Sequence, residues 1–203
     1  IALQLMQLCK HENVTPFMVF VAVYSLLLSR YCREQDIVLG SAVANRMQPS
    51  LEALIGLFMN TVAIRTRVDE QQSFDALLAQ VRQTTLDAYA NQQLPFEKLV
   101  EILAPERSLA HSPVFQHMLI VQNAPFAPAR LPGVSIEPII RPSRTAKFDT
   151  TMQWYEYRGS WHCAIEFNTS VLARAAVSEL FVNFENILDA ALQYWVIRNS
   201  GIE

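Results

Sequence analysis

The chain has 203 residues, of which 51% are hydrophobic and 10% aromatic, so it can bury one sizeable core and is not disordered. A net charge of −3 and a pI of about 5.8 give no basic surface, which argues against nucleic acid as a partner. The longest apolar run, residues 16–28, is too short to span a bilayer, so we expect no membrane segment and no membrane partner.

The cysteines bear on the redox environment of the protein, and the start of the chain bears on the length of the polypeptide. Cys9, Cys32 and Cys163 are odd in number, widely spaced and without a Cys-x-x-Cys pair, which argues against a disulfide framework and a structural zinc site. We therefore expect a reducing, cytoplasmic location. The chain starts at Ile1 within an amphipathic pattern and shows neither an initiator methionine nor a signal peptide, so we expect it to be part of a longer polypeptide.

Hydrophobic periodicity, cap residues and turn residues predict a series of helices and strands. In chain order these are a helix at 1–12, a helix at 16–31, a strand at 36–43, a strand at 61–68, a helix after Ser73, a short helix at 96–103, a strand at 115–122, a hairpin of 148–157 with 161–168, and a helix at about 173–195. The 36–43 segment is apolar without alternation, as in a strand covered on both faces. The sequence therefore predicts an α/β fold, with helices packed on a mixed β-sheet.

Finer details of these elements also follow from the pattern. In the first helix, Leu3 and Met6 share one side with Leu5 and Leu8, and this side is expected to face the core. Thr15 is the expected N-cap of the second helix, which is apolar nearly all round and therefore buried. Residues 124–144 hold half of the ten prolines and are expected to form an extended arm or long loop, with a possible edge strand at 134–140.

Four motifs occur in a fixed order along the chain. They are Asp36-Ile-Val-Leu-Gly40 continuing to Arg46, then Ile55-Gly-Leu-Phe-Met-Asn-Thr-Val-Ala-Ile-Arg65, then Gln92-Gln-Leu-Pro-Phe-Glu97, and finally Arg107-Ser-Leu-Ala-His-Ser-Pro113-Val-Phe115-Gln. An ordered series is far more specific than any one motif. Over about residues 1–195, with 196–203 as the start of a linker, the chain resembles the C-terminal subdomain of a condensation domain from a nonribosomal peptide synthetase.

The resemblance implies a fold and a set of partners. Such domains consist of two chloramphenicol-acetyltransferase-like subdomains in a V, and the second forms one wall of a tunnel for two phosphopantetheine arms. The partners implied are the N-terminal condensation subdomain, the donor and acceptor peptidyl carrier proteins, and a neighbouring adenylation domain. The arms belong to the carrier proteins, so no cofactor is expected to bind to this chain directly. The segment 124–144 is the candidate for an arm that crosses to the first subdomain.

The family's motif residues can be carried over position by position as candidates for the tunnel wall. The matches are Gly40, Arg46, Gly56, Phe58, Asn60, Thr61, Arg65, Gln92, Pro95, Phe96, Glu97, Arg107 and Pro113. Departures occur at Met59, where valine is usual, at Gln93, where aspartate is usual, and at 110–112. Asn60 either orients the reacting groups or satisfies the backbone of its loop. Glu97, just inside a helix start, also suits the helix dipole.

The sequence shows no self-sufficient active site. The family's catalytic signature, His-His-x-x-x-Asp-Gly, belongs to the first subdomain and is absent here. Of the four histidines, His162 is expected to be exposed on a strand and His117 to be a hydrogen-bonded core residue. Ser41 lacks the second glycine of a nucleophile elbow and is interpreted as structural. We therefore assign no catalytic or metal-ligating residue and expect the chain to be inactive alone.

Three functional hypotheses remain open at this point. The first is a condensation domain that joins an acyl or peptidyl donor to an aminoacyl acceptor, both tethered to carrier proteins, through an amide bond. The second is a non-catalytic condensation-like domain that recruits a tailoring enzyme or carrier protein. The third is a free-standing acyltransferase that uses a coenzyme A thioester. Without the histidine motif, condensation and heterocyclisation cannot be separated. We also expect the face meant for the first subdomain to expose apolar side chains.

Overall fold

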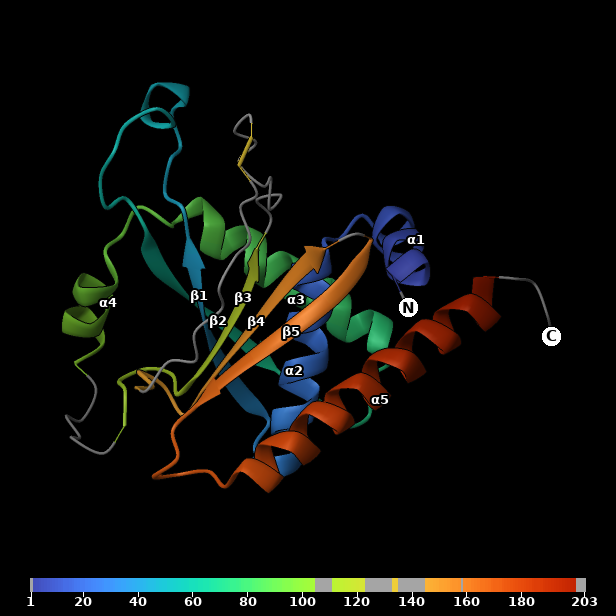
Figure 1. Ribbon diagram of the computed structural model, residues 1–203. Coiled ribbons are helices and arrows are strands. Elements are labelled where there is room, and N and C mark those ends of the chain that lie inside the picture. The colour runs from blue at the N-terminus through green and yellow to red at the C-terminus, as the bar shows by residue number, and fades with distance from the viewer. Residues whose placement is uncertain (1, 105–110, 123–132, 135–144, 158, 200–203) are drawn as a thin grey trace.

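The computed structural model describes residues 2–104, 111–122, 133–134, 145–157 and 159–199 (Figure 1). The elements are α1 Ala2–Glu12, α2 Pro16–Cys32, β1 Asp36–Val43, the 3-10 turn η1 Pro49–Leu51, β2 Asn60–Arg67, α3 Phe74–Ala90, α4 Phe96–Leu103, β3 His117–Gln122, β4 Thr150–Tyr157, β5 Ser160–Phe167 and α5 Arg174–Asn199. The predicted α/β class is confirmed.

The five strands form one mixed sheet in the order β2-β1-β3-β4-β5. β1 pairs antiparallel with β2 and parallel with β3, while β4 pairs parallel with β3 and antiparallel with β5. The β4–β5 hairpin turns at Gly159, whose φ of 77° suits glycine. The parallel ladder between β1 and β3 has only two pairs, whereas the ladder between β3 and β4 has six. β1 and β3 therefore separate toward their carboxyl ends.

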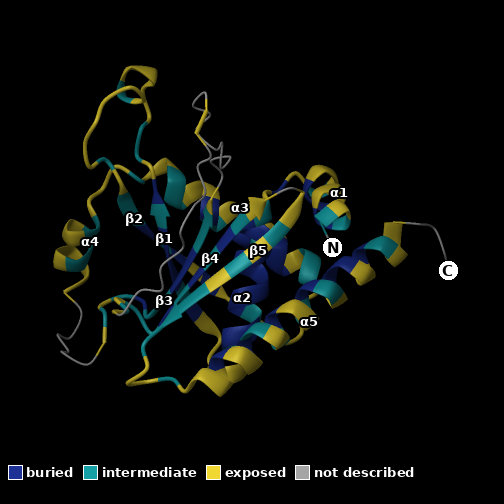
Figure 2. Cartoon of the chain, viewed as in Figure 1, coloured by how far each residue is buried: buried dark blue, intermediate teal, exposed yellow. Residues whose placement is uncertain are grey.

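The core lies between the sheet and the helices α2, α3 and α5. α2 is buried along most of its length (Figure 2), and its N-terminus is capped by Thr15, whose hydroxyl accepts a hydrogen bond from the Met18 amide at 3.3 Å. The Phe20 ring of α2 stacks on Trp154 of β4 with ring centroids 4.6 Å apart, and Phe184 of α5 packs 5.3 Å from the same indole. Helices α2 and α5 thus share one face of the sheet.

Several sequence predictions need correction. In α1 the buried residues are Leu5, Leu8 and Cys9, whereas Leu3 and Met6 are exposed, because the side of the helix that holds Leu5 and Leu8 packs on α2 and α5. Strand β3 begins at His117 rather than at 115, and α5 continues to Asn199, past the predicted end at about 195. The predicted arm at 124–144, apart from Gly133 and Val134, lies outside the described residues.

His162 and His117 occupy the kinds of position that the sequence predicts for them. His162 is exposed on β5. The Nδ1 atom of His117 lies 2.8 Å from the Thr150 hydroxyl, which in turn lies 2.5 Å from the Tyr24 hydroxyl in the core. Burial lowers the pKa of His117, and the nearby Asp149 carboxylate partly opposes this effect. His117 is therefore a neutral, hydrogen-bonded core residue at neutral pH.

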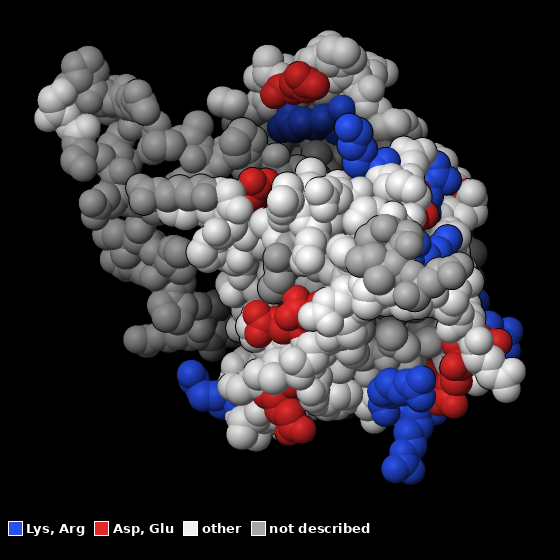
Figure 3. All heavy atoms as spheres, turned by 90° about the vertical axis from the view of Figure 1, so that its right-hand side faces the viewer, with Lys and Arg blue, Asp and Glu red and all other residues white. Residues whose placement is uncertain are grey.

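The charged surface agrees with what the composition indicates. On the face in Figure 3, the acidic and basic side chains of the described residues are interspersed, without a continuous basic area. No single helix in the described part of the chain is long and apolar enough to cross a membrane, and α1 with α2 reaches that composition only as a pair bent by 101°.

Candidate functional site

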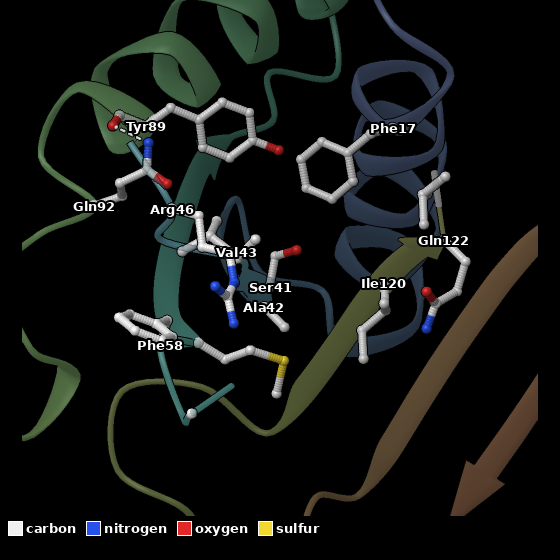
Figure 4. A pocket seen from close by; sticks show the side chains of 14 residues that line it. Phe17, Ser41, Ala42, Val43, Arg46, Phe58, Tyr89, Gln92, Ile120 and Gln122 are labelled. Atoms are coloured by element: carbon white, nitrogen blue, oxygen red, sulfur yellow. Dashed lines mark hydrogen bonds between the residues drawn. The ribbon is translucent and has the colours of Figure 1, made fainter. Parts of the chain in front are cut away.

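A cavity of about 590 Å³ lies where β1 and β3 separate, between their carboxyl-terminal parts. Crevices at the carboxyl ends of parallel strands are common ligand sites in α/β folds. The residues around it come from α2, β1, the loop that follows β1, the end of α3, and β3 (Figure 4). They are Phe17, Ser41, Ala42, Val43, Ala44, Arg46, Gly56, Phe58, Met59, Tyr89, Gln92, Ile120, Val121 and Gln122.

The lining is largely apolar, with neutral polar groups at a few points. Ser41, Tyr89, Gln92 and Gln122 supply hydroxyls and amides, and Arg46 is the charged residue among the described lining residues. The Arg46 guanidinium donates a hydrogen bond to the Leu51 carbonyl, and it lies 4.2 Å over the centre of the Phe58 ring. Arg46 is thus already engaged in holding the loop. The mostly apolar lining, with hydroxyl and amide groups at a few points, suits a largely apolar chain that carries hydrogen-bonding groups.

Gly40 of β1 gives space to an aromatic cluster beside the cavity. A Cβ atom at Gly40 would lie 2.1 Å from Cε2 of Phe115, whose ring is only 1% exposed. The Phe115 ring also packs against Phe96, with centroids 5.4 Å apart, and against Phe148, at 5.1 Å. Three of the four sequence motifs therefore meet at Phe115, since Gly40 and Phe96 belong to the first and third.

A tight turn aims Phe115 at the sheet. Val114 has a φ of 72°, and the Phe115 amide donates a hydrogen bond to the Pro113 carbonyl at 2.9 Å. This three-residue arrangement is a γ-turn, which is rare and strained for a β-branched residue. The burial of the Phe115 ring offsets that strain. The motif residue Pro113 contributes its backbone carbonyl, which accepts the hydrogen bond that closes the turn.

Asn60, at the start of β2, holds the segment between α3 and α4 in place. Its Nδ2 atom donates to the carbonyls of Gln92, at 2.8 Å, and Leu94, at 2.7 Å, and its Oδ1 accepts from the amide of Phe96 at 3.1 Å. These three hydrogen bonds use both ends of the side-chain amide. Of the two roles considered for Asn60, the geometry matches that of satisfying loop backbone.

The structure brings four of the thirteen motif candidates to the cavity and leaves the others elsewhere. Arg46, Gly56, Phe58 and Gln92 line it. Gly40, Asn60, Phe96 and Pro113 support the surrounding structure as described above. Thr61 is half-buried within β2, and Arg65, Pro95 and Glu97 are exposed. Arg107 lies outside the described residues.

Arg65 has a partner of its own, away from the cavity. Its guanidinium binds both carboxylate oxygens of Asp36 on the neighbouring strand, with Nη2 2.6 Å from Oδ2. These hydrogen bonds lower the pKa of Asp36. The pair is solvent-exposed, so its contribution to stability is small.

Ten of the fourteen lining residues were not site candidates from sequence, and four of these supply a ring, a hydroxyl or an amide to the cavity. Phe17 and Tyr89 have nearly parallel rings with centroids 6.2 Å apart, at the start of α2 and the end of α3, and both looked like core residues. Ser41 is buried, as a structural residue would be, yet it also borders the cavity, as does Gln122. One signal was available, because Ser41 and Gln122 fall near the ends of two predicted strands, where a crevice is expected if the strands are parallel.

Within the described residues, no group of three or more histidine, cysteine or acidic side chains is placed to hold a metal ion. Burial raises the pKa of the Cys9 thiol to about 11 and that of the Cys163 thiol to about 12, so neither is a ready nucleophile. In its described part, the chain offers a lined cavity rather than a reactive group.

Comparison with known proteins identifies the family. The Condensation domain model matches residues 1–194. The chain is 40% identical over 188 residues to one of the linear gramicidin synthase proteins of Brevibacillus parabrevis, covering 92% of the chain and 4% of that synthase. The chain therefore belongs to the condensation-domain family, and it spans only a small part of the length of the curated relatives that it matches.

Solved structures share the fold. A four-domain nonribosomal peptide synthetase bound to AMP and glycine superposes with a TM-score of 0.87 at 20% identity, over 95% of this chain and 16% of that one. The X-domain from teicoplanin biosynthesis, also solved in complex with OxyB, gives a TM-score of 0.80 at 23% identity, over 98% of this chain and 45% of that one. The resemblance and the chloramphenicol-acetyltransferase-like fold class are thereby confirmed.

Apolar side chains are exposed on the loop 44–59, which lies between β1 and β2. They are Met47, Leu54, Ile55, Leu57 and Met59. Ile55 and Leu57 are 105% and 88% exposed, so folding gains almost nothing from burying them. Contiguous exposed apolar groups are typical of a contact surface, so this loop is a candidate for the face that is expected to be uncovered.

Replacing Ile55 and Leu57 together by serine should lower the binding of a hydrophobic dye to the isolated chain. The unfolding free energy should change by no more than about 0.5 kcal/mol, because both side chains are exposed. Dye fluorescence and thermal unfolding would measure the two effects. Val182→Ser, which removes one exposed apolar side chain from α5, is the control. Equal dye binding by the double variant and the original chain would argue against this loop as the apolar surface.

Proposed function

We propose that this chain is the C-terminal subdomain of a condensation domain that forms an amide bond between two carrier-tethered substrates. The observation that carries the proposal is the convergence of Arg46, Gly56, Phe58 and Gln92, from three separate motifs, on one cavity at the strand ends. The identity of 40% to a gramicidin synthase supports the same function. The cavity forms part of the wall of the substrate tunnel.

In this proposal the chain binds and orients, and the first subdomain supplies the base. The amine nitrogen of the acceptor attacks the thioester carbon of the donor, so that a C–N bond forms, the C–S bond breaks, and the thiol leaves with the proton given up by the amine. Both substrates arrive on phosphopantetheine arms, and holding them together supplies much of the rate. The partly apolar lining of the cavity, with its hydroxyl and amide groups, fits such arms.

The proposed partners follow from this role. They are the N-terminal condensation subdomain, the donor and acceptor peptidyl carrier proteins, and a neighbouring adenylation domain, all in the cytoplasm. The exposed loop 44–59 is the proposed contact with the first subdomain, because it combines apolar side chains with motif residues that line the cavity.

The test begins with the coding region upstream of Ile1, which should encode His-His-x-x-x-Asp-Gly in a comparable subdomain. The intact domain, mixed with a donor carrier bearing an acyl or peptidyl thioester and an acceptor carrier bearing an aminoacyl thioester, should give the amide on the acceptor carrier. Mass spectrometry of the carrier proteins detects this product. The 203-residue chain alone should give none.

Three outcomes would contradict the proposal. Amide formation by the isolated chain at the rate of the intact domain would show that the first subdomain is not needed. An intact domain that forms no amide but captures a tailoring enzyme or a carrier protein would establish the non-catalytic alternative. Transfer from a coenzyme A thioester in the absence of carrier proteins would establish the free-standing acyltransferase.

A further inference from the structure

The edges of β1 and β3 that face each other across the cavity have backbone groups without a strand partner in the described part of the chain. The ladder between these strands consists of Leu39 with His117 and Gly40 with Met118. Beyond it, among the described residues, positions 41–43 of β1 pair only with β2 on their other side, and positions 120–122 of β3 pair only with β4. Both stretches line the cavity. Backbone groups along such an open edge can pair with another extended chain.

Tyr89 places a hydroxyl inside the same cavity. Its ring is held by stacking on Phe17, and its hydroxyl points into the space that Ser41 also faces (Figure 4). This hydroxyl forms no hydrogen bond to another of the described residues. Burial raises the pKa of Tyr89, so the hydroxyl keeps its proton at neutral pH and is available as a donor.

A ligand that fills the cavity removes water from this hydroxyl. A half-buried donor that loses water without gaining an acceptor costs free energy, so a ligand that presents an acceptor there, such as a carbonyl oxygen, is favoured. Apart from Arg46, which contacts Leu51 and Phe58, the described lining residues are uncharged, so a chain with neutral amide groups suits most of the lining.

We propose that the cavity holds a neutral, amide-bearing chain in extended form between β1 and β3, and that Tyr89 donates a hydrogen bond to one of its carbonyl oxygens. This inference rests on the proposed function, because a carrier-protein arm is such a chain. Tyr89 is thus a positioning residue for the arm. It sets how deep the chain sits, because each amide carbonyl of the chain reaches the hydroxyl at a different depth.

The experiment measures binding of D-pantetheine, a neutral molecule with two amides, to the intact condensation domain that contains this chain. Tyr89→Phe keeps the ring and its stacking on Phe17 and removes only the hydroxyl. We expect it to weaken binding by about 2- to 10-fold, the effect of one neutral hydrogen bond. Tyr194→Phe on α5, which removes an exposed and distant hydroxyl, should leave binding unchanged.

A second comparison identifies the atom that Tyr89 contacts. Two analogues of pantetheine, each with one amide replaced by two methylene groups, are bound to both proteins. One analogue should bind more weakly to the original domain by at least the same factor, and Tyr89→Phe should weaken it no further, because the hydrogen bond is already absent. The inference is overturned if Tyr89→Phe binds pantetheine as tightly as the original domain does. It is also overturned if Tyr89→Phe weakens the binding of both analogues by the factor by which it weakens the binding of pantetheine.

Amide formation measured in parallel separates this inference from the proposed function. If the original domain forms the amide and Tyr89→Phe leaves pantetheine binding unchanged, the function stands and the role of Tyr89 falls. If pantetheine binding depends on Tyr89 and no amide forms, the role of Tyr89 stands and the amide-forming function falls. If the original domain neither binds pantetheine nor forms the amide, both are overturned.

Discussion

Replacing Gly40 by alanine should destabilise the chain by about 1–3 kcal/mol, the usual cost of forcing extra atoms into a packed core. The added methyl group would lie 2.1 Å from the Phe115 ring, which Phe96 and Phe148 prevent from moving aside. The sign of the change in unfolding free energy is informative, because alanine normally stabilises a strand interior relative to glycine by about 0.5–1 kcal/mol. Urea unfolding followed by circular dichroism would measure the change.

A double-mutant cycle with Phe115→Leu serves as the control for Gly40→Ala. Leucine is smaller than phenylalanine, so the added methyl group should cost less in that background, and the two substitutions should not be additive. If Gly40→Ala is neutral or stabilising, or if its cost is the same with leucine at 115, then the contact with Phe115 is not the reason for glycine at this position.

Replacing Asn60 by alanine should release the segment that leads into α4. The substitution removes three hydrogen bonds, each contributing about 0.5–1 kcal/mol here, so α4 should open locally more often. We expect the backbone amides of α4 to exchange with deuterium about 10- to 100-fold faster, because α4 has no buried residue of its own among those described. Hydrogen exchange with mass spectrometry resolves this helix from α2 and α5.

Asn91→Ala is a matched control, since the side chain of this neighbouring asparagine donates one hydrogen bond, to the Asp87 carbonyl on its own helix. It should leave the exchange of α4 nearly unchanged. Asn60→Asp tests the direction of the bonds, because aspartate can still accept from the Phe96 amide but cannot donate to the carbonyls of Gln92 and Leu94. Unchanged exchange in α4 for Asn60→Ala would contradict the role assigned to this side chain.

Features fixed by local chemistry could be predicted from the sequence. The caps at Thr15 and Ser73 accept the expected backbone hydrogen bonds, and the alternation of Val62, Ile64 and Thr66 places all three on the buried face of β2. The hairpin at Gly159 is equally local. In each case the residues that decide the structure lie within a few positions of one another.

Features that depend on distant partners were missed. In α1 the apolar residues lie on more than one side, so periodicity alone did not reveal that Leu5 would be buried and Met6 exposed; contact with α5 and α2 decides this. The cavity required Phe17 and Tyr89 to meet, and each pattern alone indicates a core position. Motif residues such as Arg65, by contrast, proved remote from the cavity because a motif does not distinguish supporting residues from lining residues.

The two-pair ladder between β1 and β3 also has a mechanical meaning. It divides the sheet into β1 with β2 on one side and β3, β4 and β5 on the other, joined by few backbone hydrogen bonds. Helix α2 contacts both β1 and β3, so it packs across the boundary between the two groups of strands. A rotation of one group of strands against the other would widen or narrow the cavity while breaking almost none of the sheet. The same junction that opens the site is the place where two neighbouring strands of the sheet share the fewest paired residues.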